Sequence, residues 1–174
     1  MAEREQAILV DANDTIIGYK YRDELVEGDR FRIVGVWLEN HLGQVLIAQR
    51  SHRKKHHASL WGAAAAGGVA RGESYEESAY KELEEEIGIS SVQLHKASKE
   101  LVTNPENNVE RFCQWFIGRI ETDSYDMFTL SQEEVAHIHW IDKQILLEDV
   151  LASPQHYTPS CENWPTLFAA NNLV

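Results

Sequence analysis

Three glutamates stand close together in the segment KELEEEIGI, residues 81 to 89. Successive residues of a helix are about 100° apart, so Glu82, Glu85 and Glu86 would fall within one arc of about 100°. Like charges at these spacings disfavour a bare helix, and oxygen ligands of this kind suit hard divalent cations such as Mg²⁺ or Mn²⁺. The spacing therefore indicates either a site for a divalent cation or an acidic helix face in solvent.

A helix over residues 75 to 87 is needed to position these carboxylates. Ser74 and Glu77 have the spacing of a capping box, and Gly88 supplies a C-terminal stop. Three apolar residues recur every four positions on a neighbouring stripe: Ala79, Leu83 and Ile87. This stripe would anchor the helix to a sheet, and we expect the carboxylates to face an adjacent cleft.

A longer array surrounds the helix. It runs from Gly67 over five residues to Glu73, then over seven residues to the segment 81 to 89. The array resembles the Nudix box of the Nudix hydrolase superfamily, which reads Gly-x5-Glu-x7-Arg-Glu-apolar-x-Glu-Glu-x-Gly-apolar. Every specified position matches except Lys81, where the family has arginine, and chance agreement over so many positions is remote.

This resemblance implies an α/β fold, a Nudix-type α/β/α sandwich on a mixed sheet. It also implies Mg²⁺- or Mn²⁺-dependent attack of water on a diphosphate joined to another group, the cation neutralising diphosphate oxygens and lowering the pKa of the water. The metal ligands it implies are Glu82, Glu85, Glu86 and the carbonyl of Gly67. The resemblance also implies that one of the carboxylates serves in catalysis as general base and that Glu73 is an orienting acid.

Lys81 is the departure from the family pattern that matters most. The resemblance implies that an arginine at this position holds the glutamates by a forked hydrogen bond, which a lysine ammonium cannot reproduce. Lys81 either supports catalysis in another way or pairs on the helix surface with Glu85. A non-catalytic binding or regulatory module with this fold is the alternative that Lys81 favours.

Part of the chain also resembles the isopentenyl-diphosphate isomerase branch of the superfamily. The isomerase pattern Trp-x4-Cys-Gly-His falls on residues 61 to 68, with Ala66 at the cysteine and Gly68 at the histidine. A His-Arg pair of the isomerase falls on Phe31 and Arg32. Methyl and hydrogen side chains cannot transfer protons, so we expect an isomerase-like hydrolase without isomerase activity.

Residues 50 to 57, RSHRKKHH, concentrate positive charge in an acidic chain. The candidates for binding diphosphate oxygens are Arg50, Arg53, Lys54 and Lys55, joined by His52, His56 and His57 when protonated. The alternative is a polar loop in solvent. A zinc site is disfavoured, because no cysteines stand at finger spacing.

Two further candidates lie outside these segments. Glu134 falls where Nudix hydrolases often place another carboxylate, and it is either an auxiliary ligand or base or a solvated acid at a strand edge. Trp61 is a candidate for stacking on a flat part of the substrate, although large aromatic side chains are more often part of the core.

The chain length of 174 residues fits one domain, with an N-terminal hairpin (1–29), a core (30–150) and a C-terminal extension (151–174). A net charge of −12 argues against broad nucleic-acid binding and anionic membranes. The partner that the Nudix resemblance implies is a small diphosphate substrate. Cys113 and Cys161 indicate a reducing compartment, by default the cytoplasm. No run approaches the roughly 20 apolar residues of a membrane span. The sequence does not decide whether the chain forms a homodimer.

Residue patterns predict the remaining elements. We expect hairpins over 7–27 and 31–51, an extended segment over 62–68, strands over 92–103, 110–121 and 137–142, and a helix over 143–152. The helical spacing of residues 143–152 is that of Ile145, Leu146, Val150 and Leu151. A loop and a short C-terminal helix should follow, and whether Tyr157, Trp164 and Phe168 cover the cleft or a dimer surface stays open.

Overall fold

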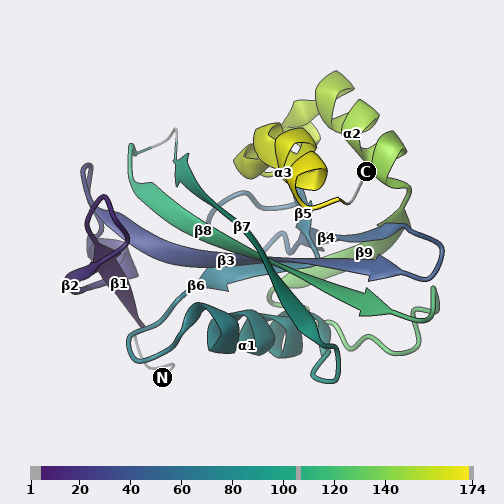
Figure 1. Ribbon diagram of the computed structural model, residues 1–174, viewed down its shortest axis with the longest axis horizontal. Coiled ribbons are helices and arrows are strands. Elements are labelled where there is room, and N and C mark those ends of the chain that lie inside the picture. The colour runs from purple at the N-terminus through teal and green to yellow at the C-terminus, as the bar shows by residue number, and fades with distance from the viewer. Residues whose placement is uncertain (1–4, 105–106, 173–174) are drawn as a thin grey trace.

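Apolar runs form nine strands of one mixed sheet in the computed structural model, which describes residues 5–104 and 107–172. The strands are β1 (Gln6–Val10), β2 (Ile16–Tyr21), β3 (Arg30–Asn40), β4 (Val45–Arg50), β5 (Trp61–Ala63), β6 (Ala65–Gly68), β7 (Leu94–Thr103), β8 (Glu110–Ile120) and β9 (Val135–Ile141). Helix α1 (Tyr75–Ile87) covers one face, and α2 (Lys143–Ala152) and α3 (Trp164–Ala170) cover the other (Figure 1). This confirms the predicted α/β class and its helix–sheet–helix layering.

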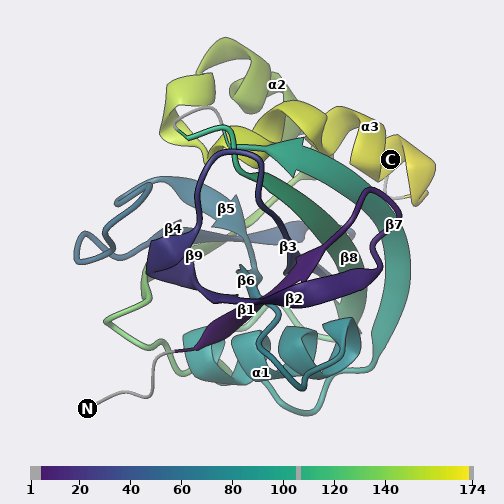
Figure 2. The same ribbon diagram turned by 90° about the vertical axis from the view of Figure 1, so that its left-hand side faces the viewer.

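Strand β3 lies at the centre of the sheet (Figures 1 and 2). It pairs in parallel with β8 along its whole length and antiparallel with β6. Strand β7 extends the β8 side, whereas β4 pairs with β5 and β9. The extended segment predicted over 62–68 is thus present as β5 and β6, and β6 leads into the loop before α1.

The two predicted hairpins have different outcomes. Strands β1 and β2 form the N-terminal hairpin, which joins the sheet through Leu9 and Phe31. Strands β3 and β4 are antiparallel neighbours, as predicted for the second hairpin, but their ladder is short and contains the pair Glu39 and Val45. Both edges of β3 are instead occupied by β6 and β8, and β4 turns away to pair with β9.

The predicted helix over 75–87 is confirmed as α1. The hydroxyl of Ser74 accepts a hydrogen bond from the Glu77 amide, the Glu77 carboxylate accepts one from the Ser74 amide, and Gly88 ends the helix at φ 75°. The stripe of Ala79, Leu83 and Ile87 is fully buried against the sheet. Local capping and one apolar stripe therefore fix which side of α1 can face the sheet.

Helix α2 has the predicted bounds but a narrower buried face. Leu146 and Val150 are buried, whereas Ile145 is 58% exposed and Leu151 is 75% exposed. At 100° per residue the latter two lie on opposite flanks of the buried pair. The helix predicted from this spacing is therefore confirmed, with a buried face made of Leu146 and Val150.

Aromatic side chains of the C-terminal extension form a second core under α2 and α3. The Trp37 ring meets Trp164 and Phe168 edge-on, with centroids 4.9 and 4.8 Å apart, and Tyr157 packs beside Trp164. All four side chains are buried. The extension is thus an integral part of the fold.

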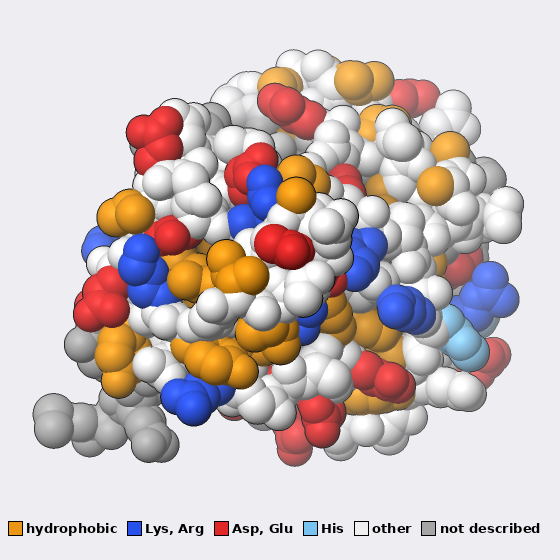
Figure 3. Space-filling view, turned by 60° about the vertical axis from the view of Figure 1, so that its left-hand side comes forward, with side chains coloured by type: hydrophobic (Ala, Val, Ile, Leu, Met, Phe, Trp, Pro, Cys, Tyr) orange, Lys and Arg blue, Asp and Glu red, His pale blue; other side chains and the backbone are white. Residues whose placement is uncertain are grey.

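The outer strand β2 presents apolar side chains to solvent. Ile16, Ile17 and Tyr19 are between 42% and 67% exposed. On this side of the molecule, charged side chains of both signs interrupt the apolar surface (Figure 3). Within the described residues, no helix is long and apolar enough to cross a bilayer.

Candidate active site

Two glutamates of α1 lie against the backbone of β6. A Cβ atom on Gly67 would stand 1.8 Å from Oε1 of Glu82, so only glycine allows this carboxylate to lie so close. The amide of Ala66 donates a hydrogen bond of 3.3 Å to Oε2 of Glu86. The loop and helix predicted from the Nudix box thus meet at these two carboxylates.

Burial dominates the electrostatics of the pair. Glu86 is only 7% exposed, and its burial, followed by the charge of Glu82, raises its pKa to about 8. Burial also raises the pKa of Glu82 to about 7, against the opposing effect of Arg22. Because neither carboxyl group ionises easily beside the other, a nearby positive charge would stabilise the ionised form of both.

The carboxylates suit a divalent cation in donor chemistry, although they do not form a closed cage. Glu85, the third predicted ligand, is exposed to solvent. Across residues 5–104 and 107–172, no three Asp, Glu, His or Cys side chains are gathered so as to hold a metal ion. Oxygen-only donors, of which Glu86 is buried and Glu82 partly buried, nevertheless fit Mg²⁺ or Mn²⁺.

Lys81 has partners other than the one predicted for a surface lysine. Its ammonium lies 3.1 Å from Oε1 of Glu73 and 2.7 Å from Oε1 of Glu5, rather than beside Glu85. Glu73 also accepts a hydrogen bond of 2.6 Å from the Ser78 hydroxyl. Lys81 therefore pairs with Glu73, the predicted orienting acid, and with Glu5.

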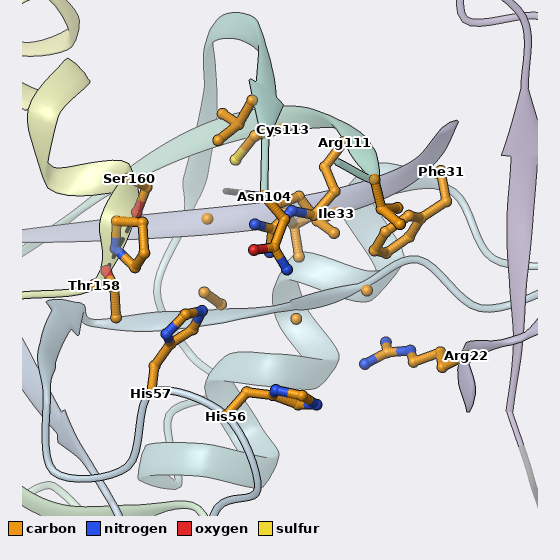
Figure 4. A pocket seen from close by; sticks show the side chains of 18 of the residues that line it. Arg22, Phe31, Ile33, His56, His57, Asn104, Arg111, Cys113, Thr158 and Ser160 are labelled. Carbon is orange, nitrogen blue, oxygen red and sulfur yellow. Dashed lines mark hydrogen bonds between the residues drawn. The ribbon is translucent and has the colours of Figure 1, made fainter. Parts of the chain in front are cut away.

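A cavity of about 500 Å³ opens beside Gly67 (Figure 4). Its apolar lining comes mainly from β3 and β8 and includes Phe31, Ile33, Cys113 and Trp115. The Trp115 ring covers Gly35 of the neighbouring strand, where a Cβ atom would stand 2.3 Å from it. The cavity thus has a flat apolar wall, and it reaches the box through Ala66, Gly67 and Gly68, whereas Glu82, Glu85 and Glu86 are not among its lining residues.

Basic side chains line much of the remaining surface of the cavity. They are Arg22, Arg50, Lys55, His56, His57 and Arg111, with Asp23 as a lining acid. Figure 4 shows His56 and His57 on one side, with Asn104 and Arg111 across the cavity. This excess of cationic groups suits an anionic ligand.

The predicted substrate-binding residues separate into two groups. Arg50 and Lys55 line the cavity. Arg53 and Lys54 do not line it; they form ion pairs with Glu133 and Glu134, which fasten the 51–60 loop to the segment before β9. Glu134, the predicted auxiliary carboxylate, is therefore already held by Lys54.

Trp61 also lies away from the cavity lining. It is half-buried and packs against the second core. Its carbonyl accepts a hydrogen bond of 2.8 Å from the Thr158 amide. The geometry thus gives Trp61 a packing role, and its contact with substrate stays a prediction.

Arg22 is the main lining residue that the sequence did not reveal. Its guanidinium lies over Gly68, where a Cβ atom would stand 2.0 Å from Nη2. Arg111 and Asn104 were likewise missed. The positive charge of Arg22 is visible in the sequence, but only the docking of the N-terminal hairpin on β3 brings its side chain to the cavity.

The comparisons with known proteins agree with this geometry. The family model described as the NUDIX domain matches residues 29–160. An isopentenyl-diphosphate Delta-isomerase of Klebsiella pneumoniae (strain 342) is 25% identical over 173 residues, 96% of this chain and 90% of that protein. An uncharacterized Nudix hydrolase of Pseudomonas aeruginosa is 29% identical over 154 residues, 88% of each chain.

Solved structures show the same fold. DR0079 from Deinococcus radiodurans superposes with a TM-score of 0.79 at 20% identity, covering 94% of this chain and 99% of that one. The dihydroneopterin triphosphate pyrophosphohydrolase of E. coli has a TM-score of 0.60 at 16% identity, covering 82% and 96%. With the family match over most of its length, the chain belongs to the Nudix hydrolase family.

Proposed function

We propose that this protein hydrolyses a diphosphate linkage in a small organic diphosphate, such as a nucleoside diphosphate derivative, with Mg²⁺ or Mn²⁺. The observation that carries the proposal is the position of Glu82 against Gly67 and of the buried Glu86 against the Ala66 amide, on a strand that also lines a cavity rich in cationic groups. Such a cavity would bind the diphosphate beside the carboxylates.

The residues that would hold the cation are Glu82, Glu86 and the carbonyl of Gly67, with Glu85 joining from the solvent side. When bound, a divalent cation supplies charge neutralisation for diphosphate oxygens and lowers the pKa of the attacking water. Arg22, Arg50 and Lys55 would bind and orient the diphosphate by charge-assisted hydrogen bonds. The apolar wall at Phe31 and Trp115 would exclude water from the organic part.

Proton transfer from water requires a carboxylate that can be reached. Lys54 holds the carboxylate of Glu134, so that ion pair would have to open before Glu134 could accept a proton. We therefore assign the base to one of the box glutamates and keep Glu134 as an auxiliary group. Lys81 would act indirectly, through its contact with Glu73.

Hydrolysis is favoured over alkene isomerisation because of three lining residues. Ala66, Gly68 and Phe31 stand where the isomerase pattern has its cysteine and two histidines, and all three line the cavity. None of them can donate or accept a proton. The similarity to the Klebsiella isomerase is therefore taken as shared ancestry rather than shared chemistry.

We also propose a reducing compartment, the cytoplasm, for this protein. Cys113 and Cys161 are free thiols buried in the fold, as suits a chain that keeps its cysteines reduced. A small diphosphate is the expected partner, and a homodimer is an arrangement that sedimentation would test.

The experiment that tests the function is product release from a panel of organic diphosphates with Mg²⁺ or Mn²⁺. We expect turnover by the native protein and a loss of about 100-fold or more in Glu86→Gln. Glu85→Gln should also lose activity if this carboxylate joins the cation. The control is Glu76→Gln, which removes an exposed carboxylate of the same helix outside the box positions.

Thermal unfolding in a chelator separates a catalytic effect from misfolding. Without a cation, Glu86→Gln should unfold at a higher temperature than the native protein, because it removes a buried carboxyl that Glu82 repels. No turnover on the whole panel, with ligand binding retained, would support the non-catalytic module instead.

A further inference from the structure

Lys81 obtains its second carboxylate from outside the Nudix box. A lysine ammonium is a point charge with three donors, whereas a guanidinium presents a planar fork that reaches two carboxylate oxygens at once. Here the ammonium contacts Oε1 of Glu73 at 3.1 Å and Oε1 of Glu5 at 2.7 Å. Glu5 immediately precedes β1 and is distant from the box in sequence.

The position of Glu5 is fixed by backbone contacts next to it. The carbonyl of Gln6 accepts a hydrogen bond of 2.9 Å from the Arg71 amide, and Ala7 forms a bridge with Ala70. The Arg71 side chain donates a further hydrogen bond of 3.1 Å to the Gln6 side chain. The start of the N-terminal hairpin is therefore joined to the loop that connects β6 to α1.

Glu73 is held from two sides by this arrangement. Its second oxygen, Oε2, accepts a hydrogen bond of 2.6 Å from the Ser78 hydroxyl of α1. The side chains of Glu73, Lys81 and Glu5 are 25%, 32% and 44% exposed, so their contacts are only partly screened by solvent. The three side chains connect the hairpin, the box loop and the helix that carries Glu82.

We propose that Glu5 is a positioning residue for the box helix, which replaces, through Lys81, the second contact that an arginine fork would make. Glu5 does not line the cavity. Its other oxygen, Oε2, lies 3.9 Å from Nη2 of the cavity residue Arg22, a long contact between side chains that are 44% and 45% exposed, so the main action of Glu5 is on the loop–helix geometry. The N-terminal hairpin is then part of the machinery that orients the carboxylates. This inference rests on the proposed hydrolysis only for its activity readout.

A cycle of four proteins tests it: native, Glu5→Ala, Lys81→Arg and the double variant. Glu5→Ala should lower kcat about fivefold, the rate equivalent of about 1 kcal/mol for a partly exposed ion pair, with KM little changed. In the Lys81→Arg background, Glu5→Ala should lower kcat by less than about twofold, because the arginine fork binds Glu73 without help from Glu5. Glu76→Ala, an exposed carboxylate of α1, is the matched control.

Equal losses from Glu5→Ala in both backgrounds, or no loss with Lys81 present, would overturn the proposal. Melting temperatures of the same four proteins in a chelator give a second readout that needs no turnover. Glu5→Ala should lower the melting temperature more with Lys81 than with arginine at position 81, and equal shifts would count against the proposal. If the native protein turns over nothing, the proposed function fails while this second readout still decides the role of Glu5.

Discussion

Single side chains at the edge of β6 decide what the cavity can hold. Gly67 leaves space for the Glu82 carboxylate, and Gly68 leaves space for the Arg22 guanidinium. The two glycines therefore allow a carboxylate and a guanidinium to lie against neighbouring residues of one strand. Their absent side chains are as important to the site as the charged groups that use the space.

Gly68→Ala should move Arg22 out of the cavity. The new Cβ atom would stand 2.0 Å from Nη2, and the far end of a flexible side chain is what must give way. We expect KM for a diphosphate substrate to rise about tenfold, as one charge-assisted contact is lost, while the melting temperature changes little. Gly18→Ala is the control, since nothing lies within 4 Å of a Cβ there. An unchanged KM would show that Arg22 does not bind the substrate.

At the scale of elements, the turn of the N-terminal hairpin is fastened by a partly buried acid, Asp14. Asp14 Oδ1 lies 2.7 Å from Nε of Arg32 on β3, and Oδ2 lies 2.5 Å from Nζ of Lys99 on β7. The Tyr75 hydroxyl donates to the same carboxylate from α1. Asp14 thus holds four elements together, at a turn position with φ 62°.

Asp14→Asn should weaken the fold in a pH-dependent way. Burial alone would raise the pKa of Asp14, but hydrogen bonds from Lys99 and Arg32 outweigh it and hold the pKa below its usual range. The stabilisation is therefore present above about pH 4 and is lost as pH falls through the lower folded-state pKa. We expect a loss of about 2 kcal/mol in the free energy of unfolding at pH 7, which shrinks below pH about 4.

Urea unfolding followed by tryptophan fluorescence across this pH range measures the effect. Asparagine also tolerates the left-handed backbone of this turn, so the substitution removes the charge without straining the chain. Asp123→Asn, at an exposed carboxylate, is the control. A difference between Asp14→Asn and the native protein that stays constant with pH would refute the argument.

Elements with local signals could be predicted, and contacts across the sheet could not. The bounds of α1 followed from Ser74, Glu77 and Gly88, which act within a few residues of one another. The approach of Glu5 to Lys81 depends on bridges between distant segments, which no spacing in the sequence encodes. The same holds for Arg22, because Leu9 must first pair with Phe31.

At the scale of the whole molecule, two apolar cores lie on opposite faces of the sheet. The core under α1 contains Leu83 and Ile87, and the core under α3 contains Trp37, Trp164 and Phe168. The candidate site depends on both cores, since α1 supplies the carboxylates and the segment before α3 supplies cavity residues such as Ser160.

Trp164→Ala should therefore destabilise the whole protein. Trp164 is fully buried, and removing a buried tryptophan costs about 3–5 kcal/mol. Denaturant unfolding should show this loss as a lower midpoint, whereas Leu151→Ala, at a side chain 75% exposed, should change little. A loss below about 1 kcal/mol in Trp164→Ala would mean that the C-terminal extension is dispensable.

The parallel pairing of β3 with β8 has a consequence for synthesis of the chain. The paired residues, from Arg30 and Glu110 onward, are 80 positions apart. At about 5–20 residues per second, a ribosome adds those positions in roughly 4–16 s, during which β3 has emerged without its neighbour. Strand β6 can already pair with the other edge of β3, but the edge that β8 will occupy stays open to chaperones and to other nascent chains throughout that interval. Yield in the cell thus depends on how quickly β8 follows β3 out of the ribosome.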